Sequence, residues 1–262
     1  MASNLSTIGF LFDGEDKFRE TMLACAAEAQ DQVSCPAGDY GIWRSRSGAE
    51  IWFHLGQTPE GQVEILGLTP FFEGKSEVPL TLTQVVGREG DNPFEGALYG
   101  MVKPEEESRD EGGFPIMFEA VDFALSSAAT LPGSYVARLS AFAREITAYA
   151  SEETYYAAHE GLEQPVFAAQ AFIPIGLFAA EQSQEGAAAA SEIPASTVLF
   201  TGKIIEHNVF TNEASGREFV WMLVETLQAT IDVLADPSII AGTIEDGAVV
   251  KVSALLFGRL IG

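Results

Sequence analysis

Residues 198–210 read Val198-Leu-Phe-Thr-Gly-Lys-Ile-Ile-Glu-His-Asn-Val-Phe210, a stretch rich in β-branched and aromatic residues with rough alternation. A cluster of turn-forming residues, Thr211–Gly216, follows it. The next run, Glu218 to Thr226, is apolar on both alternating faces. The sequence therefore predicts a β-hairpin that another part of the chain covers on at least one face.

The chain after this hairpin continues the strand pattern. Thr230 to Ala235 is a third apolar run, and Asp236-Pro237 ends it because proline has no N–H for a sheet. Ser238 to Ala241 is long enough for one helical turn. After the turn signal Glu245-Asp-Gly247, the run Ala248 to Leu260 predicts a long last strand.

This order of strands, turn and short helical piece resembles an OB-type barrel. The resemblance is carried by Thr201-Gly202-Lys203-Ile204, Phe219 to Glu225, Ile231-Asp-Val233 and Gly247-Ala-Val-Val-Lys-Val252. Four strands are clear where that fold has five. The fifth is hidden in the last segment, split at Ser253, or supplied from upstream. The resemblance implies binding of oligonucleotides.

The charge of the chain argues against that ligand. The sequence has 38 acidic and 14 basic residues and a formal net charge of −24. Phosphate contacts from Lys and Arg supply most nucleic-acid affinity, so we expect no nucleic acid and no anionic membrane surface as a partner. No stretch approaches the roughly 18 apolar residues of a membrane helix. Met1 to Phe12 lacks the basic region of a secretion signal, and we expect a cytoplasmic protein.

The first part of the chain predicts one helix and several strands. Ser6 to Phe12 predicts a strand, and Asp13 is the expected N-cap of a helix that ends near Gln32. Three strands are expected next: Tyr40 to Ser45, Ala49 to Leu55 and Val63 to Phe72.

This βαβββ order resembles one module of the glyoxalase-like (vicinal oxygen chelate) proteins. The resemblance implies a metal-binding cup with His, Glu or Gln ligands, for which His54, Glu64 and Glu119 are the candidates. No spacing rule connects these three residues, and a half-exposed His54 at a strand end is the alternative interpretation. We therefore expect no metal and no cofactor.

Further along, Val78 to Val86 and Gly96 to Val102 predict strands, and Ser151 starts a capped helix that ends at Gly161. Tyr135 to Tyr149 fits both a strand and a helix, and the preceding Pro132-Gly133 favours a strand. The predicted fold is α+β, mostly β. It has an N-terminal mixed-sheet domain with one or two helices (1–178), a linker (179–195) and a small OB-like barrel domain (196–262).

The usual catalytic motifs are missing from the sequence. It has no Gly-x-Ser-x-Gly, no phosphate-binding Gly-x-x-x-x-Gly-Lys loop and three scattered histidines, so no catalytic residue is assigned. We expect a non-enzymatic protein-binding or assembly module, acting as a homo-oligomer or on a protein partner. Trp221 and Phe257 are the candidate contact residues, with core packing as the alternative. The other two hypotheses are a metal-dependent enzyme with a glyoxalase-like cup and an OB-type single-stranded nucleic-acid binder.

Overall fold

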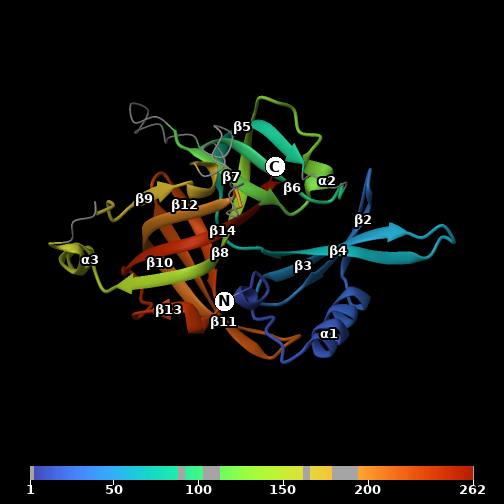
Figure 1. The fold of residues 1–262 in the computed structure, drawn as a ribbon, viewed down its shortest axis with the longest axis horizontal. Helices are drawn as coiled ribbons and strands as arrows, with labels where there is room; N and C mark the ends of the chain where they lie inside the picture. Colours follow the sequence, from blue (N-terminus) through green and yellow to red (C-terminus); the bar gives the residue numbers. More distant parts are fainter. Residues whose placement is uncertain (1–2, 88–91, 103–112, 162–165, 179–193, 262) are drawn as a thin grey trace, which may run out of the picture.

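Strands make up most of the structure, a computed structural model that describes residues 3–87, 92–102, 113–161, 166–178 and 194–261 (Figure 1). They form a four-stranded sheet and a mixed ten-stranded sheet. The predicted α+β, mostly β, fold class is confirmed. Of the predicted linker 179–195, residues 179–193 lie outside the described residues.

The four-stranded sheet is an antiparallel meander with α1 (Glu15–Ala27) against β2 (Figure 1). Its strands are β1 (Asp31–Cys35), β2 (Gly38–Arg44), β3 (Ala49–Gln57) and β4 (Val63–Phe72). The three strands predicted between residues 40 and 72 are confirmed. β1 was not predicted, because α1 ends at Ala27 and not near Gln32.

The predicted strand Ser6 to Phe12 is wrong. Residues Ser6–Ile8 form a short 3-10 helix, η1, which ends at Gly9 with a φ of 86°. Hydroxyl groups hold this turn: Ser6 N–H donates to Ser3 Oγ (3.1 Å), and Thr7 Oγ1 donates to the Asn4 carbonyl (2.7 Å). Such local side-chain bonds compete with sheet pairing. The order of elements therefore differs from the βαβββ order on which the glyoxalase-like resemblance rested.

The start of α1 also differs from the prediction. Its N-cap is Gly14, not Asp13, and no side chain caps the helix. Glu15 and Asp16 do occupy the first turn, where negative charge suits the helix dipole. Thr21, Met22 and Cys25 are the buried residues of this helix.

The ten-stranded sheet contains the rest of the strands. They are β5 (Val78–Gly87), β6 (Gly96–Val102), β7 (Pro115–Ala120), β8 (Gly133–Tyr149), β9 (Ala171–Ile173), β10 (Thr197–Asn212), β11 (Arg217–Thr226), β12 (Ala229–Ala235), β13 (Ile240–Ala241) and β14 (Val249–Ile261). Short helices also lie between the described strands, among them α2 (Phe123–Ser126), α3 (Glu152–His159) and η3 (Pro237–Ile239). The strand interpretation of residues 135–149 is confirmed, as is the capped helix after Ser151.

Five strands of this sheet close on themselves to form what we call the C-terminal circuit. β10 pairs with β11, β11 with β12, β12 with β8, β8 with β14, and β14 with β10. All pairings are antiparallel except β12–β8, which is parallel. The strand that completes this circuit, β8, comes from upstream in the sequence.

A second set of five strands closes in the same way and is called the upstream circuit. β5 pairs with β6, β6 with β7, β7 with β14, β14 with β8, and β8 with β5. Again one pairing, β7–β14, is parallel and the others are antiparallel. The two circuits thus share the long strands β8 and β14.

One buried apolar cluster runs through both circuits. On β8, Ala137, Leu139 and Ala141 point into it at alternate positions, and Val252 and Leu256 do so on β14. Hydrogen-bonded strands from the predicted segments 1–178 and 196–262 therefore belong to one sheet. The division of the chain into those domains stays a prediction.

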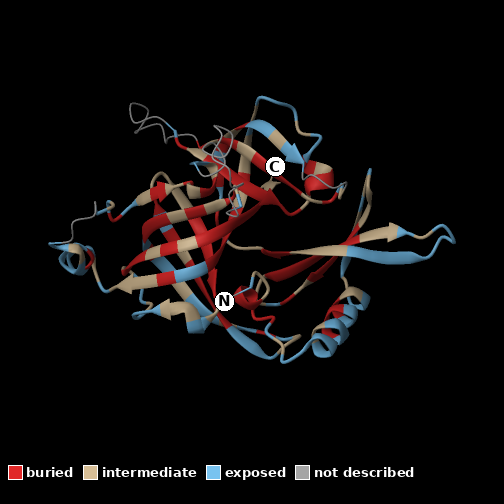
Figure 2. Ribbon diagram, in the orientation of Figure 1, coloured by how far each residue is buried: buried red, intermediate tan, exposed pale blue. Residues whose placement is uncertain are grey.

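A second cluster fills the space between the four-stranded sheet and the outer face of the circuits. Phe72 from β4 lies against Trp221 from β11, with ring centroids 6.3 Å apart. Phe142 and Phe257 from the shared strands belong to the same cluster. The cluster fixes the base of the β3–β4 hairpin, while the far end of that hairpin extends away from the body (Figures 1 and 2).

Candidate functional site

The three candidate metal ligands lie in different surroundings. His54 on β3 is fully buried, Glu64 on β4 is exposed, and Glu119 on β7 lines a cavity. Within the described residues, no three His, Cys, Asp or Glu side chains are grouped so that they could hold a metal ion.

His54 is packed among aromatic rings, not half-exposed. Its ring stacks on Phe94 at 4.9 Å and meets the edge of Tyr40 at 5.8 Å. Its Nε2 is 3.0 Å from Thr69 Oγ1, and its Nδ1 has no hydrogen-bond partner among the residues that the structure describes. Burial lowers the pKa of His54 from 6.5 to about 4, so the imidazole is neutral at pH 7.

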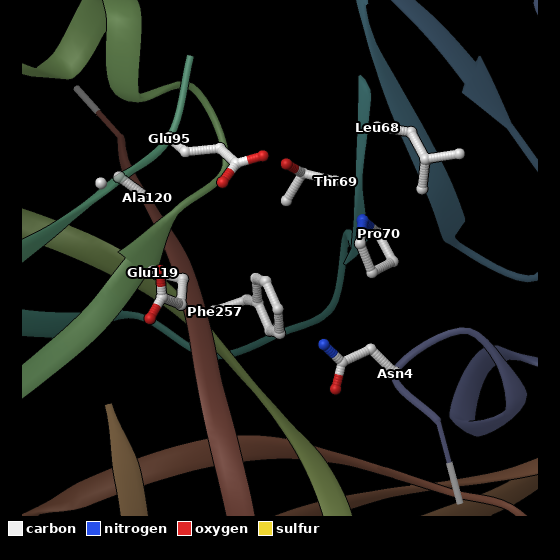
Figure 3. A pocket seen from close by; sticks show the side chains of 9 residues that line it. Asn4, Leu68, Thr69, Pro70, Glu95, Glu119, Ala120 and Phe257 are labelled. Carbon is white, nitrogen blue, oxygen red and sulfur yellow. The ribbon is translucent and has the colours of Figure 1, made fainter. Parts of the chain in front are cut away.

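Glu119 lies in a small cavity of about 160 Å³ between the two sheets (Figure 3). It accepts a hydrogen bond from Ser196 Oγ at 2.7 Å. Glu95 and Thr69 point toward the same space, and the ring of Phe257 forms part of its wall (Figure 3). Thr69 lines this cavity, and its hydroxyl also contacts His54 Nε2. Two of the three candidate ligands, His54 and Glu119, are therefore near the same region, with the Thr69 hydroxyl between His54 and the cavity. A space of this size holds only a few atoms.

The two candidate contact residues are in the core. Trp221 is 3% exposed and Phe257 is 5% exposed. The Trp221 indole N–H donates to Asp232 at 2.7 Å, and the Phe257 ring packs on Phe142 at 4.7 Å. Neither side chain therefore offers a free surface to a partner.

Exposed apolar side chains gather at the far end of the β3–β4 hairpin. Val63 is 67% exposed, Ile65 42% and Leu66 51%. Figure 2 shows the outer part of this hairpin as exposed. The sequence predicted the strand 63–72 but not the exposure of its first half. Its run Val63-Glu-Ile-Leu66 has the apolar character of a covered strand.

The hairpin has a bulge at Leu66. Leu55 pairs with Ile65 and His54 pairs with Gly67, which leaves Leu66 as an extra residue on β4. Leu66 lies over Gly56, where an added Cβ would be 2.8 Å from Leu66 Cδ1. The side chains of Ile65 and Leu66 therefore lie on opposite faces of the hairpin.

One of these faces continues into a groove. A cavity of about 350 Å³ is lined at its apolar part by Ala26, Ala29, Gly41, Phe53 and Leu55. Directly paired residues on antiparallel strands share a face, so Ile65 lies beside Leu55 and Val63 lies beside Gln57. We call the surface formed by these five cavity residues together with Ile65 and Val63 the hairpin groove. It runs from α1 to the exposed end of β4.

The rim of the hairpin groove is acidic. Residues 26–35 and 54–67 contain no Lys or Arg; Glu28, Asp31 and Glu60 border the groove, while Glu64, which pairs with Gly56, lies on the opposite face of the hairpin from Val63 and Ile65. All four acidic residues are exposed. Arg44 reaches this region from β2, but its guanidinium pairs with Asp31 and with buried Glu50. The groove thus combines an apolar floor with excess negative charge.

Comparison with known proteins gives no match: no protein-family model, no curated protein and no solved structure is similar to this chain. In the described part of the chain, no helix is long and apolar enough to span a membrane.

Proposed function

We propose that this chain is a non-enzymatic protein-binding or assembly module whose contact surface is the hairpin groove. The proposal depends on the exposure of Val63 and Ile65 beside a groove that is already apolar. Contiguous exposed apolar surface on a folded protein is typical of contact sites. Packing against a partner would remove this surface from water at about 25 cal/mol per Å².

The strand order supports an OB-type architecture for the C-terminal circuit. β10, β11 and β12 follow one another in the sequence, η3 and the two-residue strand β13 separate β12 from β14, and β8 is the fifth strand of the circuit. OB-type barrels bind oligonucleotides on the face of their second and third strands. Here the outer face of β11 and β12 packs under this chain's own residues, with Phe219, Trp221 and Leu234 in the cluster around Phe72. This packing and the negative charge favour a structural role for the barrel.

Two substitutions at the exposed end of β4 test the proposed function. In Val63→Asp and Ile65→Asp, a charge replaces an apolar side chain that contacts a partner. Val209→Asp is the matched control, because Val209 is 52% exposed on the β10–β11 hairpin. All three proteins should unfold close to wild type, within about 0.5 kcal/mol, since exposed side chains contribute little to stability.

The measurements are light scattering after size exclusion, over a range of protein concentrations, and affinity capture from a lysate of the source organism. Captured proteins are then purified and mixed with each variant. We expect self-association or reconstituted binding that both β4 variants weaken at least tenfold and that Val209→Asp leaves unchanged. Equal behaviour of wild type and the β4 variants in both measurements would refute the proposed function.

A further inference from the structure

We infer that the occupant of the hairpin groove is a segment of another protein that carries apolar side chains flanked by Lys or Arg. This inference rests on the proposed function and specifies the chemistry of the partner. It follows from the two properties of the groove, an apolar floor and an acidic rim, where the nearby Arg44 is already paired with Asp31 and Glu50.

The apolar floor of the hairpin groove favours a partner that carries apolar side chains. Phe53 and Leu55 on β3 and Ala26 and Ala29 at the end of α1 offer carbon atoms to a bound side chain. Ile65 extends this surface beyond the cavity. A polar segment would lose hydrogen bonds to water here without gaining new ones, which costs free energy.

The negative charge around the groove favours a partner that carries basic side chains. The exposed acidic side chains Glu28, Asp31 and Glu60 border the groove, and Asp31 pairs with Arg44. The whole chain carries a net charge of −24. A cationic segment is attracted over the range of the Debye length, roughly 8–10 Å at physiological salt.

The same charge argues against a second copy of this chain as the occupant. A copy docked through its own hairpin groove would bring a second acidic rim, with Glu28, Asp31 and Glu60, toward the first, on two bodies that each carry −24. Like charges facing each other oppose association. A basic partner relieves this repulsion, because it neutralises the rim.

Synthetic peptides test the inference with a defined probe. Two peptides contain Leu and Lys, one alternating for an extended chain and one with Leu at helical spacing. Matched peptides carry Glu in place of every Lys. Binding is measured by isothermal titration calorimetry with the full-length chain. We expect at least one Lys peptide to bind and neither Glu peptide to do so.

Variants of the chain separate docking from bulk charge attraction. Ile65→Asp makes the groove more negative and less apolar, so general attraction predicts equal or tighter binding of the Lys peptide. Docking in the groove predicts at least tenfold weaker binding. Val63→Asp, at a more exposed position, should act in the same direction even if Ile65→Asp perturbs the hairpin. Val209→Asp should change the affinity less than twofold.

Charge reversal gives the complementary result. The double variant Glu28→Lys with Glu60→Lys should weaken binding of the Lys peptide severalfold, while raised salt should do the same for wild type. The inference is overturned if neither Lys peptide binds, or if Ile65→Asp and Val63→Asp both bind as well as wild type. A groove that captures an acidic protein or a second copy would overturn the inference and leave the proposed function standing. If the β4 variants leave every interaction unchanged, both the inference and the proposed function are overturned.

Discussion

Trp221 and Asp232 lie on neighbouring strands, and the indole N–H of Trp221 donates a 2.7 Å hydrogen bond to Asp232 Oδ1. The same carboxylate accepts backbone N–H groups from Lys75 (3.1 Å) and Ser76 (2.7 Å), just after the four-stranded sheet. Burial raises the pKa of Asp232, and these three donors oppose that effect. Asp232 therefore connects the C-terminal circuit to the segment that joins the two sheets.

Removing this carboxylate should cost much of the stability. Asp232→Ala leaves three N–H donors without this acceptor, those of Ser76 and Trp221 being buried, and we expect the free energy of unfolding to fall by about 3 kcal/mol or more. Asp232→Asn keeps one acceptor oxygen and should cost less. Urea denaturation followed by tryptophan fluorescence measures both. The exposed Glu245→Ala is the control. A loss below about 1 kcal/mol for Asp232→Ala would contradict this role.

The buried His54 predicts a loss of stability in mild acid. The unfolded chain takes up a proton at His54 as the pH falls through 6.5, whereas the folded protein does so only near pH 4. Stability from the neutral imidazole is thus complete above pH 6.5, falls between pH 6.5 and 4, and falls no further below. The expected loss is about 3 kcal/mol, at 1.36 kcal/mol per pKa unit.

His54→Gln isolates this contribution. Many carboxyl groups titrate over the same range, so the informative quantity is the difference in unfolding free energy between wild type and His54→Gln at each pH. That difference should move in favour of the variant as the pH falls from 7 to 4. A difference that stays constant with pH would show that His54 is not buried in its neutral form.

The ion pair between Arg44 and Glu50 should stabilise the charge of Glu50 more than it stabilises the charge of Arg44. Glu50 is buried and accepts hydrogen bonds from Arg44 Nε (2.6 Å) and Trp52 Nε1 (2.7 Å). Arg44→Met leaves a buried carboxylate without its cation, at an expected cost of about 3 kcal/mol at pH 7. The double variant with Glu50→Gln should recover part of this loss, because no buried charge remains.

Thermal and urea unfolding of the single and double variants measure the coupling. Burial raises the pKa of Glu50, and loss of Arg44 should raise it further, so the cost of Arg44→Met should shrink as the pH falls and Glu50 is protonated. Arg46→Met, at a nearby exposed arginine, is the control. An equal cost for both arginines would contradict the prediction.

Gly258 on β14 lies where the shared strand leaves the C-terminal circuit and meets β7. An added Cβ would be 2.7 Å from Leu139 Cδ2 and 2.7 Å from Phe118 Cδ2. Gly258→Ala should therefore cost about 1–3 kcal/mol through overpacking. Gly87→Ala, where the nearest atom is 4.0 Å away, is the control and should cost less than about 0.5 kcal/mol. Calorimetric unfolding of both variants measures these two costs.

Local patterns in the sequence predicted the strands from β2 to β6 because each hairpin there has its own turn residues and alternation. They failed at Ser6–Ile8, where hydroxyl groups bond to nearby backbone and an apolar run becomes a 3-10 turn. The parallel pairing of Asp232 with Ser140 could not be predicted, because it joins residues far apart in the sequence and depends on closure of the whole circuit.

The candidate site was harder to predict than the fold. Trp221 and Val63 are both large apolar residues on strands, and only the packing of distant segments decides that the first is buried and the second exposed. The extra residue Leu66 left no signal, since a bulge depends on the register with β3. The acidic rim was visible in the composition, but its position beside an apolar groove was not.

The sharing of β8 and β14 has a consequence for how the nascent chain acquires its structure. β14 is synthesised after every other strand of the two circuits, and each circuit needs it. Until it emerges from the ribosome, β7 and β10 both present unpaired edges, which are prone to mispairing with other chains. A nonsense mutation before Val249 would therefore leave two open sheets at once, and chaperone dependence during translation should be high for a protein of this length.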